Sequence, residues 1–190
     1  MIRKATKADA VSIAPMIMVI LEDMELDVFK TLSREQVIEL LIAGIQTEDY
    51  RYSYNHGHVW EKNGEIAGIV FGYPGAIEPL IDAPLTEIIQ EKGFDTSIQL
   101  FTEPETFPNE WYLDSIVTKE SFRGQGVGTE LLAALPDFAL EDGQKVIGLN
   151  CDQQNPQAQK LYERMGFKKN GEVTISGHLY NHMQKEITEK

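Results

Sequence analysis

The sequence predicts one α/β (α+β) domain, because helical and strand-like periodicities alternate along its 190 residues. A short strand and two amphipathic helices open the chain, a β-hairpin follows them, and two strand–turn–helix units occupy much of the second half. A chain of this length buries about 70% of its unfolded surface, so its core needs no disulfide or metal. We therefore expect a single domain over residues 1–190, with an acidic insertion at about 76–109.

The first elements carry clear local signals. Residues 2–5 predict a strand, and Thr6 predicts the N-cap of a helix whose apolar residues recur at helical spacing. Ser33 caps a second amphipathic helix in the same way. Residues 58–73 predict a hairpin around Asn63–Gly64, a pair that supplies the positive φ angles of a tight turn.

Residues 76–109 have the weakest periodicity in the chain and predict one short helix near 85–92. Eight acidic residues lie between 76 and 110, where Lys92 is the single base. Such a segment could border a binding cleft and attract a cation, or it could be a solvated surface that keeps the protein soluble.

A strand over 111–118 leads through the glycine-rich turn 123–128 into a helix. The glycines leave room for backbone N–H groups to converge on an anion, and the helix N-terminus adds unpaired donors. The turn predicts a phosphate or pyrophosphate cradle, with a merely flexible connection as the alternative. It lacks the Lys of a P-loop and the glycine spacing of a dinucleotide fingerprint.

A buried strand over 146–150 precedes a short helix with strong boundary signals. Asn155 is the expected N-cap, Pro156 the first helical residue, and Gly166 the residue that ends the helix. Two final strands follow from Phe167.

Both units carry motifs that resemble those of the GNAT N-acetyltransferase superfamily. Arg123-x-x-Gly126-x-Gly128 resembles its acyl-CoA loop, and Asn155-x-x-Ala158-x-x-Leu161-Tyr162-x-x-x-Gly166-Phe167 resembles its second signature. The likeness is close over 110–187, loose over 1–73 and absent over 76–109. It implies a mixed, mostly antiparallel central sheet with two splayed parallel strands, flanked by helices.

The resemblance also implies that acetyl-CoA binds as the acyl donor, with its pantetheine arm between the two splayed strands. Asn155 would act as cap and ligand contact together, while Arg123 is either a phosphate partner or a solvated loop base. No metal is expected. The implied cofactor contacts are Ile116, Val117, Thr118, Arg123, Gly124, Gln125, Gly126, Val127, Gly128, Thr129, Asn155, Ala158 and Tyr162.

The implied activity is transfer of an acetyl group from acetyl-CoA to a primary amine by direct attack. The acceptor would be a small cationic amine, or a protein N-terminus or lysine. Tyr162 is the expected general acid for the leaving thiolate, since a phenol has a pKa near 10. Its alternative role is to pack on the inner face of a short helix.

Two carboxylates are candidates for the general base. Strand alternation places Glu110 and Asp114 on one face, where either could take the amine proton. Alternatively, both are carboxylates that face solvent at a strand end. The family often has Glu at the position of Asn150, and this departure leaves open a non-catalytic acyl-CoA-binding or sensor module.

The remaining residues with reactive side chains are interpreted as structural. Cys151, the single cysteine, is expected to be a buried and inert thiol. The pairs His56/His58 and His178/His182 are interpreted as strand-edge or surface histidines rather than metal ligands.

Composition excludes several classes of partner. A net charge of −13 argues against a nucleic-acid binder and against adhesion to an anionic membrane. The sequence contains no apolar run of membrane-spanning length and no signal-peptide core near residue 1, so we expect a cytoplasmic protein. Dimers are common in the family, and a homodimer is compatible with these residues.

Overall fold

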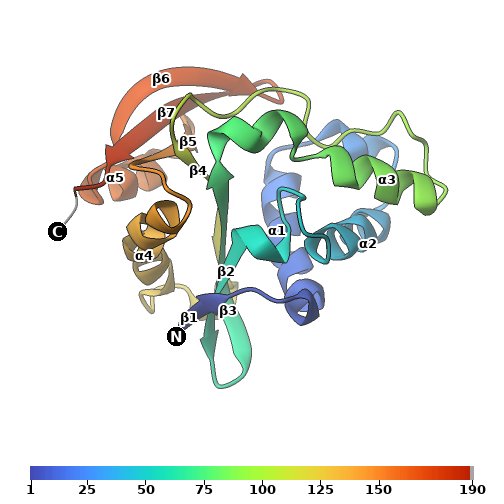
Figure 1. Cartoon of the computed structure of the whole chain (residues 1–190), viewed down its shortest axis with the longest axis horizontal. Helices are drawn as coiled ribbons and strands as arrows, with labels where there is room; N and C mark the ends of the chain where they lie inside the picture. Colours follow the sequence, from blue (N-terminus) through green and yellow to red (C-terminus); the bar gives the residue numbers. More distant parts are fainter. Residues whose placement is uncertain (189–190) are drawn as a thin grey trace.

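The computed structural model describes residues 1–188, which form a seven-stranded sheet with helices on both faces (Figure 1). The strands are β1 (Ile2–Lys4), β2 (Gly57–Lys62), β3 (Glu65–Pro74), β4 (Trp111–Thr118), β5 (Val146–Asp152), β6 (Lys168–Ile175) and β7 (His178–Glu186). The helices are α1 (Ala10–Asp23), α2 (Arg34–Ile45), α3 (Ala83–Glu91), α4 (Val127–Glu141) and α5 (Pro156–Arg164). The last two residues of the expected domain 1–190 lie outside this description.

The sheet has the order β1-β2-β3-β4-β5-β7-β6, and only the β4–β5 pair is parallel within the described part of the chain. The predicted mixed, mostly antiparallel sheet is therefore confirmed. Helices α1, α2 and α3 share one apolar cluster on one face, and α4 and α5 share a second cluster on the opposite face. The fold thus has three layers, with the sheet in the middle.

Local capping explains where the helices begin. Ser33 Oγ accepts the amide of Gln36 at 3.2 Å, and Asn155 Oδ1 accepts the amide of Ala158 at 3.1 Å. The carboxylate of Asp9 accepts the Thr6 amide at 2.8 Å, which is the reciprocal bond of a capping box at the predicted N-cap Thr6. These boundaries depend on neighbours in the chain, which is why periodicity and caps located them.

The two parallel strands separate soon after they meet. Their paired positions run only from Trp111 opposite Ile147 to Leu113 opposite Leu149. Beyond that point β5 remains paired with β7, while β4 remains paired with β3. The facing edges of the two strands are therefore open, and the opening starts at the register of Leu113.

A β-bulge marks the same place on β4. Phe71 of β3 lies opposite Ser115, and the next residue, Gly72, lies opposite Leu113. Asp114 is consequently an extra residue in β4, and a bulge of this kind bends a strand and increases its local twist. The bulge turns β4 away from β5 where the opening begins.

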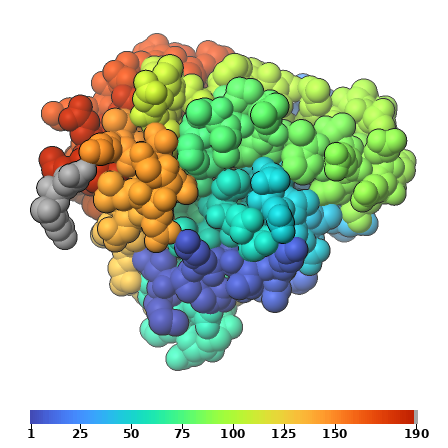
Figure 2. Space-filling model, viewed as in Figure 1, coloured from blue at the N-terminus to red at the C-terminus, as the bar shows by residue number. Residues whose placement is uncertain are grey.

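The segment 76–109 packs on the protein instead of forming a solvated loop throughout. Leu85, Ile88, Ile89 and Leu100 are buried in the cluster beneath α1 and α2. Figure 2 shows the segment in green to yellow-green, running along the top of the view from α3 toward the β6–β7 hairpin. Its far end contacts that hairpin, since the amide of Ser176 donates to Glu103 Oε1 at 3.4 Å.

Candidate active site

The glycine-rich turn before α4 is an exposed concave backbone. Gly124 and Gly126 have φ angles of +75° and +85°, a region that side chains rarely adopt, and a Cβ at either would meet nothing within 4 Å. Gly126 is the N-cap of α4 and offers no side chain to the first-turn amides. Glu130 is the first residue of this helix whose amide bonds to a main-chain carbonyl, that of Gly126. Within the described residues, the amides of residues 127–129 have no hydrogen-bond acceptor, so they are open to a ligand.

The end of β4 lies next to this turn. A cavity of about 630 Å³ between α1 and the start of β3 is lined by Val117, Thr118 and Arg123. Thr118 also approaches the turn from the sheet, because a Cβ at Gly128 would lie 3.3 Å from its hydroxyl oxygen. Three of the predicted cofactor contacts thus border one cavity.

Helix α5 places Ala158 and Tyr162 against the second apolar cluster. Burial, and to a smaller extent the nearby Cys151, raises the pKa of Tyr162 to about 12, so its phenol carries a proton at neutral pH. Burial likewise raises the pKa of Cys151 to about 11. This agrees with an unreactive thiol.

Asp114 does not face solvent. Its Oδ2 lies 2.9 Å from Arg51 Nη1 and accepts the Tyr73 hydroxyl at 3.0 Å. Its Oδ1 accepts the Ser115 hydroxyl at 2.9 Å. The carboxylate is therefore buried and bonded on both oxygens, and the solvent-facing alternative is wrong for it.

Glu110 is also buried, on the same side of the sheet. Its Oε2 lies 2.8 Å from His182 Nε2 and accepts the Gln184 amide at 2.7 Å. Its Oε1 accepts the backbone amide of Phe107 at 2.7 Å. The solvent-facing alternative is wrong here too, because the segment 76–109 and β7 cover this strand end.

Two histidines that we expected at a strand edge or surface are buried. His182 lies between Glu110 and Asn150, beneath the Phe107 ring at a centroid distance of 3.8 Å. His58 stacks on Phe138 at 3.7 Å, and burial lowers its pKa to about 4. The surface interpretation is wrong for both because each occupies an inward position on a paired strand.

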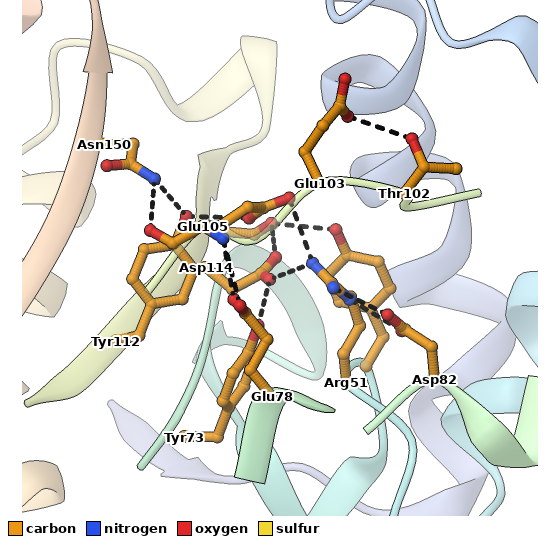
Figure 3. A network of polar contacts seen from close by, with 12 residues as sticks. Arg51, Tyr73, Glu78, Asp82, Thr102, Glu103, Glu105, Tyr112, Asp114 and Asn150 are labelled. Carbon is orange, nitrogen blue, oxygen red and sulfur yellow. Dashed lines mark hydrogen bonds and ion pairs between the residues drawn. The ribbon is translucent and has the colours of Figure 1, made fainter. Parts of the chain in front are cut away.

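Arg51, which the sequence analysis did not single out, organises the polar interior (Figure 3). Its guanidinium forms two hydrogen bonds of 2.8 Å with Asp82, contacts Asp114, and lies 3.4 Å from Glu105. It also lies over the Phe101 ring, 3.7 Å from the centroid. A residue in the loop after α2 gives no local signal that three distant carboxylates will surround it.

Glu105 is the second residue that the sequence analysis missed. It is 4% exposed, and its Oε2 accepts the Tyr112 hydroxyl at 2.9 Å. Burial raises the pKa of Glu105 to about 7, although Arg51 opposes the shift. In the sequence it is one of many acids in the segment 76–109, and only its placement distinguishes it.

A second cavity, of about 450 Å³, lies under the same segment. Its walls combine apolar side chains with more acidic than basic groups. The charged ones are Arg51, Glu78, Asp82 and Glu103, and the apolar ones include Leu85, Ile89, Leu100 and Phe101. The excess of carboxylates favours a positively charged occupant.

Within residues 1–188, the structure contains no group of three or more His, Cys, Asp or Glu side chains that could hold a metal ion. None of the helices in that range has the length and apolarity needed to cross a bilayer.

The open β4–β5 edge beside a backbone anion cradle defines a protein of the acetyltransferase class. The profile of the Acetyltransferase (GNAT) family matches residues 20–167, and the chain belongs to this family.

Solved structures share the whole fold. The crystal structure of an acetyltransferase is 50% identical, with a TM-score of 0.91 over 99% of this chain and 100% of the other. The N-acetyltransferase of Staphylococcus aureus Mu50 is 29% identical, with a TM-score of 0.85 over 97% and 100%. YncA of Salmonella typhimurium, solved with its cofactor acetyl-CoA, shares the fold at 20% identity, with a TM-score of 0.61 over 100% and 95%.

Curated relatives match over shorter stretches. Acetyltransferase Atu2258 of Agrobacterium fabrum is 37% identical over 62 residues, which are 33% of this chain and 44% of that protein. N-acetyltransferase YycN of Bacillus subtilis is 31% identical over 81 residues, which are 43% and 52%. The matched stretches thus span about half or less of these relatives.

Proposed function

We propose that the protein moves the acetyl group of acetyl-CoA to a primary amine that carries a positive charge. The observation that carries this proposal is the cradle of free amides at the start of α4, which lies beside the end of β4. Family membership and the acetyl-CoA bound to YncA of Salmonella typhimurium support the same donor. The residues fit a phosphate-bearing ligand, since Gly124 and Gly126 keep side chains out of the cradle.

When bound, acetyl-CoA would supply an activated thioester. The amides of residues 124–129 would hold its pyrophosphate, with Arg123 as a cationic neighbour. The unpaired edge of β4 at Ile116–Thr118 would bind the pantetheine arm, and a backbone N–H there would stabilise charge on the thioester oxygen. Asn155 and Ala158 at the start of α5 would line the other side of the arm.

Tyr162 would donate the proton that the leaving thiolate needs. Replacing it with Phe should lower kcat at least about 100-fold, while the Kd for acetyl-CoA changes less than about twofold. Thiol release measures the first quantity and calorimetry the second. The matched control is Tyr54→Phe, a change remote from α5. An equal loss of turnover and binding in Tyr162→Phe would contradict the acid role.

A cationic acceptor is supported by the cavity lined by Glu78, Asp82 and Glu103. In a panel of spermidine, kanamycin, a lysine peptide with a free N-terminus and neutral amines, we expect the cationic amines to give the highest kcat/KM. Their advantage should shrink as ionic strength rises, since salt screens the attraction. Equal rates for neutral and cationic amines would contradict this acceptor class.

The second candidate is an acyl-CoA-binding or sensor module without catalysis, favoured by Asn150 where the family often has Glu. Saturable binding of acetyl-CoA with no thiol release for any amine in the panel would support it over the enzyme. The cytoplasmic location and the homodimer stay predictions.

A further inference from the structure

We propose that Glu105, which the segment 76–109 brings onto the sheet, is the general base that accepts the proton of the incoming amine. The inference rests on the proposed acetyl transfer and names a catalytic residue for it. The carboxylate that the family often carries at position 150 would be supplied here by a different part of the chain.

Glu105 bonds residues of β4 and β5 close to the point where these two strands separate (Figure 3). Asp114 and Asn150 are the first residues beyond the last paired position of β4 and β5. Asn150 Nδ2 donates to the Glu105 carbonyl oxygen at 2.9 Å and to the Tyr112 hydroxyl at 3.1 Å. The Tyr112 hydroxyl in turn donates to Glu105 Oε2 at 2.9 Å. Glu105 is thus bonded to both strands where they begin to separate.

Glu105 and the expected acid Tyr162 lie on opposite faces of the sheet. Asn150 and Cys151 are neighbours on β5, so their side chains point to opposite faces of the sheet. Asn150 bonds Glu105 on one face, whereas Cys151 packs with Tyr162 on the face that carries α5. Glu105 and Tyr162 therefore approach the strand opening from opposite sides, which suits a base for the amine and an acid for the thiolate.

The carboxylate of Glu105 is less fully hydrogen-bonded than those of Asp114 and Glu110. Both oxygens of Asp114 and both oxygens of Glu110 hold bonds of 2.7–3.0 Å. Glu105 Oε1 has only the 3.4 Å contact with Arg51, which is longer than an ordinary N–H···O bond. This oxygen has the most capacity to accept another proton.

Charged and titratable groups surround Glu105 on several elements. Arg51 favours its ionised form, while Asp114 and Glu78 disfavour it. The charge of Glu105 contributes to the raised pKa values of three phenols, those of Tyr73, Tyr112 and Tyr180. Burial is the largest effect and brings the pKa of Glu105 to about 7, close to the pH at which a base must act.

The proton balance is complete without another reactant. Glu105 takes one proton from the ammonium, and the freed nitrogen attacks the thioester carbonyl carbon. The C–N bond forms, the C–S bond breaks, and Tyr162 protonates the leaving thiolate. The second proton lost by the nitrogen replaces the one that Tyr162 gave up, and Glu105 releases its proton to solvent, so the products are an amide, coenzyme A and one proton.

The test compares Glu105→Gln with Glu91→Gln, which makes the same charge change at an exposed position of the same segment. The substrates are acetyl-CoA and the amine of highest kcat/KM in the panel. In the parent protein kcat/KM should rise with pH through about 7. In Glu105→Gln it should fall about 100-fold at pH 7 and recover as the amine loses its own proton at higher pH. Glu91→Gln should match the parent.

A lowered rate with an unchanged pH profile in Glu105→Gln would show a structural role and overturn the inference. A readout independent of turnover is the carboxyl ¹³C resonance of Glu105, assigned in the parent protein. This measurement tests the inference even if Glu105→Gln does not fold. Titration near pH 7 supports the inference, and titration near 4.5 overturns it. Failure of the proposed function is distinct, because the parent would then release no thiol with any amine.

Discussion

A Gly126→Asp variant is expected to bind acetyl-CoA at least about 100-fold more weakly than the parent protein. Gly126 is the N-cap of α4 with a φ of +85°, and an added side chain there has open space around it. A carboxylate at this position would accept the first-turn amides itself and repel the pyrophosphate. Two lost charge-assisted hydrogen bonds cost about 3–6 kcal/mol, or a factor of about 100 or more.

The controls for this variant separate charge from backbone strain. Gly126→Ala carries the same positive φ without the charge, and should cost about 1 kcal/mol of folding free energy while weakening acetyl-CoA binding only a few-fold. Gly143→Asp places an Asp at φ +71° beyond the other end of α4. Calorimetry gives Kd for each folded variant. Unchanged affinity in Gly126→Asp would refute the cradle.

An Arg51→Met variant should lose about 3–5 kcal/mol of unfolding free energy. Arg51 is 1% exposed, and removing its charge leaves Asp82, Glu105 and Asp114 without their shared cation. Breaking a buried ion pair from one side costs this much because the remaining charges stay desolvated. Met retains much of the contact with Phe101, so the loss measures charge more than volume. Denaturant unfolding provides the measurement.

The deficit of Arg51→Met should also depend on pH. The pKa of Glu105 in the folded protein, about 7, lies above its ordinary value, so folding favours the protonated form between about pH 4.5 and 7. Its contribution to stability therefore declines as pH rises through that window. Without Arg51 the ionised carboxylate is still less favourable, and the deficit should be larger at pH 8 than at pH 5.

The control is Arg34→Met, which removes a largely exposed arginine that bonds Glu22 at 2.7 Å. An exposed pair contributes about 0–1 kcal/mol, so this variant should unfold almost like the parent. A similar small effect in Arg51→Met, or a deficit that does not change with pH, would contradict the role assigned to the buried network.

Most elements of the fold could be predicted from the sequence. Asn155, Pro156 and Gly166 bounded α5, Ser33 began α2, and Asn63–Gly64 located the β2–β3 turn. The glycine-rich turn was also recognisable, because positive φ angles and missing side chains are properties of the residues themselves. Periodicity predicted that Glu110 and Asp114 share a face, but did not show what would cover it.

The sequence by itself determined most helix and strand positions, the glycine-rich turn and the family, since each follows from residues close together in the chain. Only the tertiary structure decided which charges are buried. Arg51 meets Asp82, Glu105 and Asp114, and His182 meets Glu110, through contacts that span from 31 to 72 positions. Desolvation depends on what packs around a group, and a carboxylate such as Glu105 becomes a candidate base only when the fold excludes water from it.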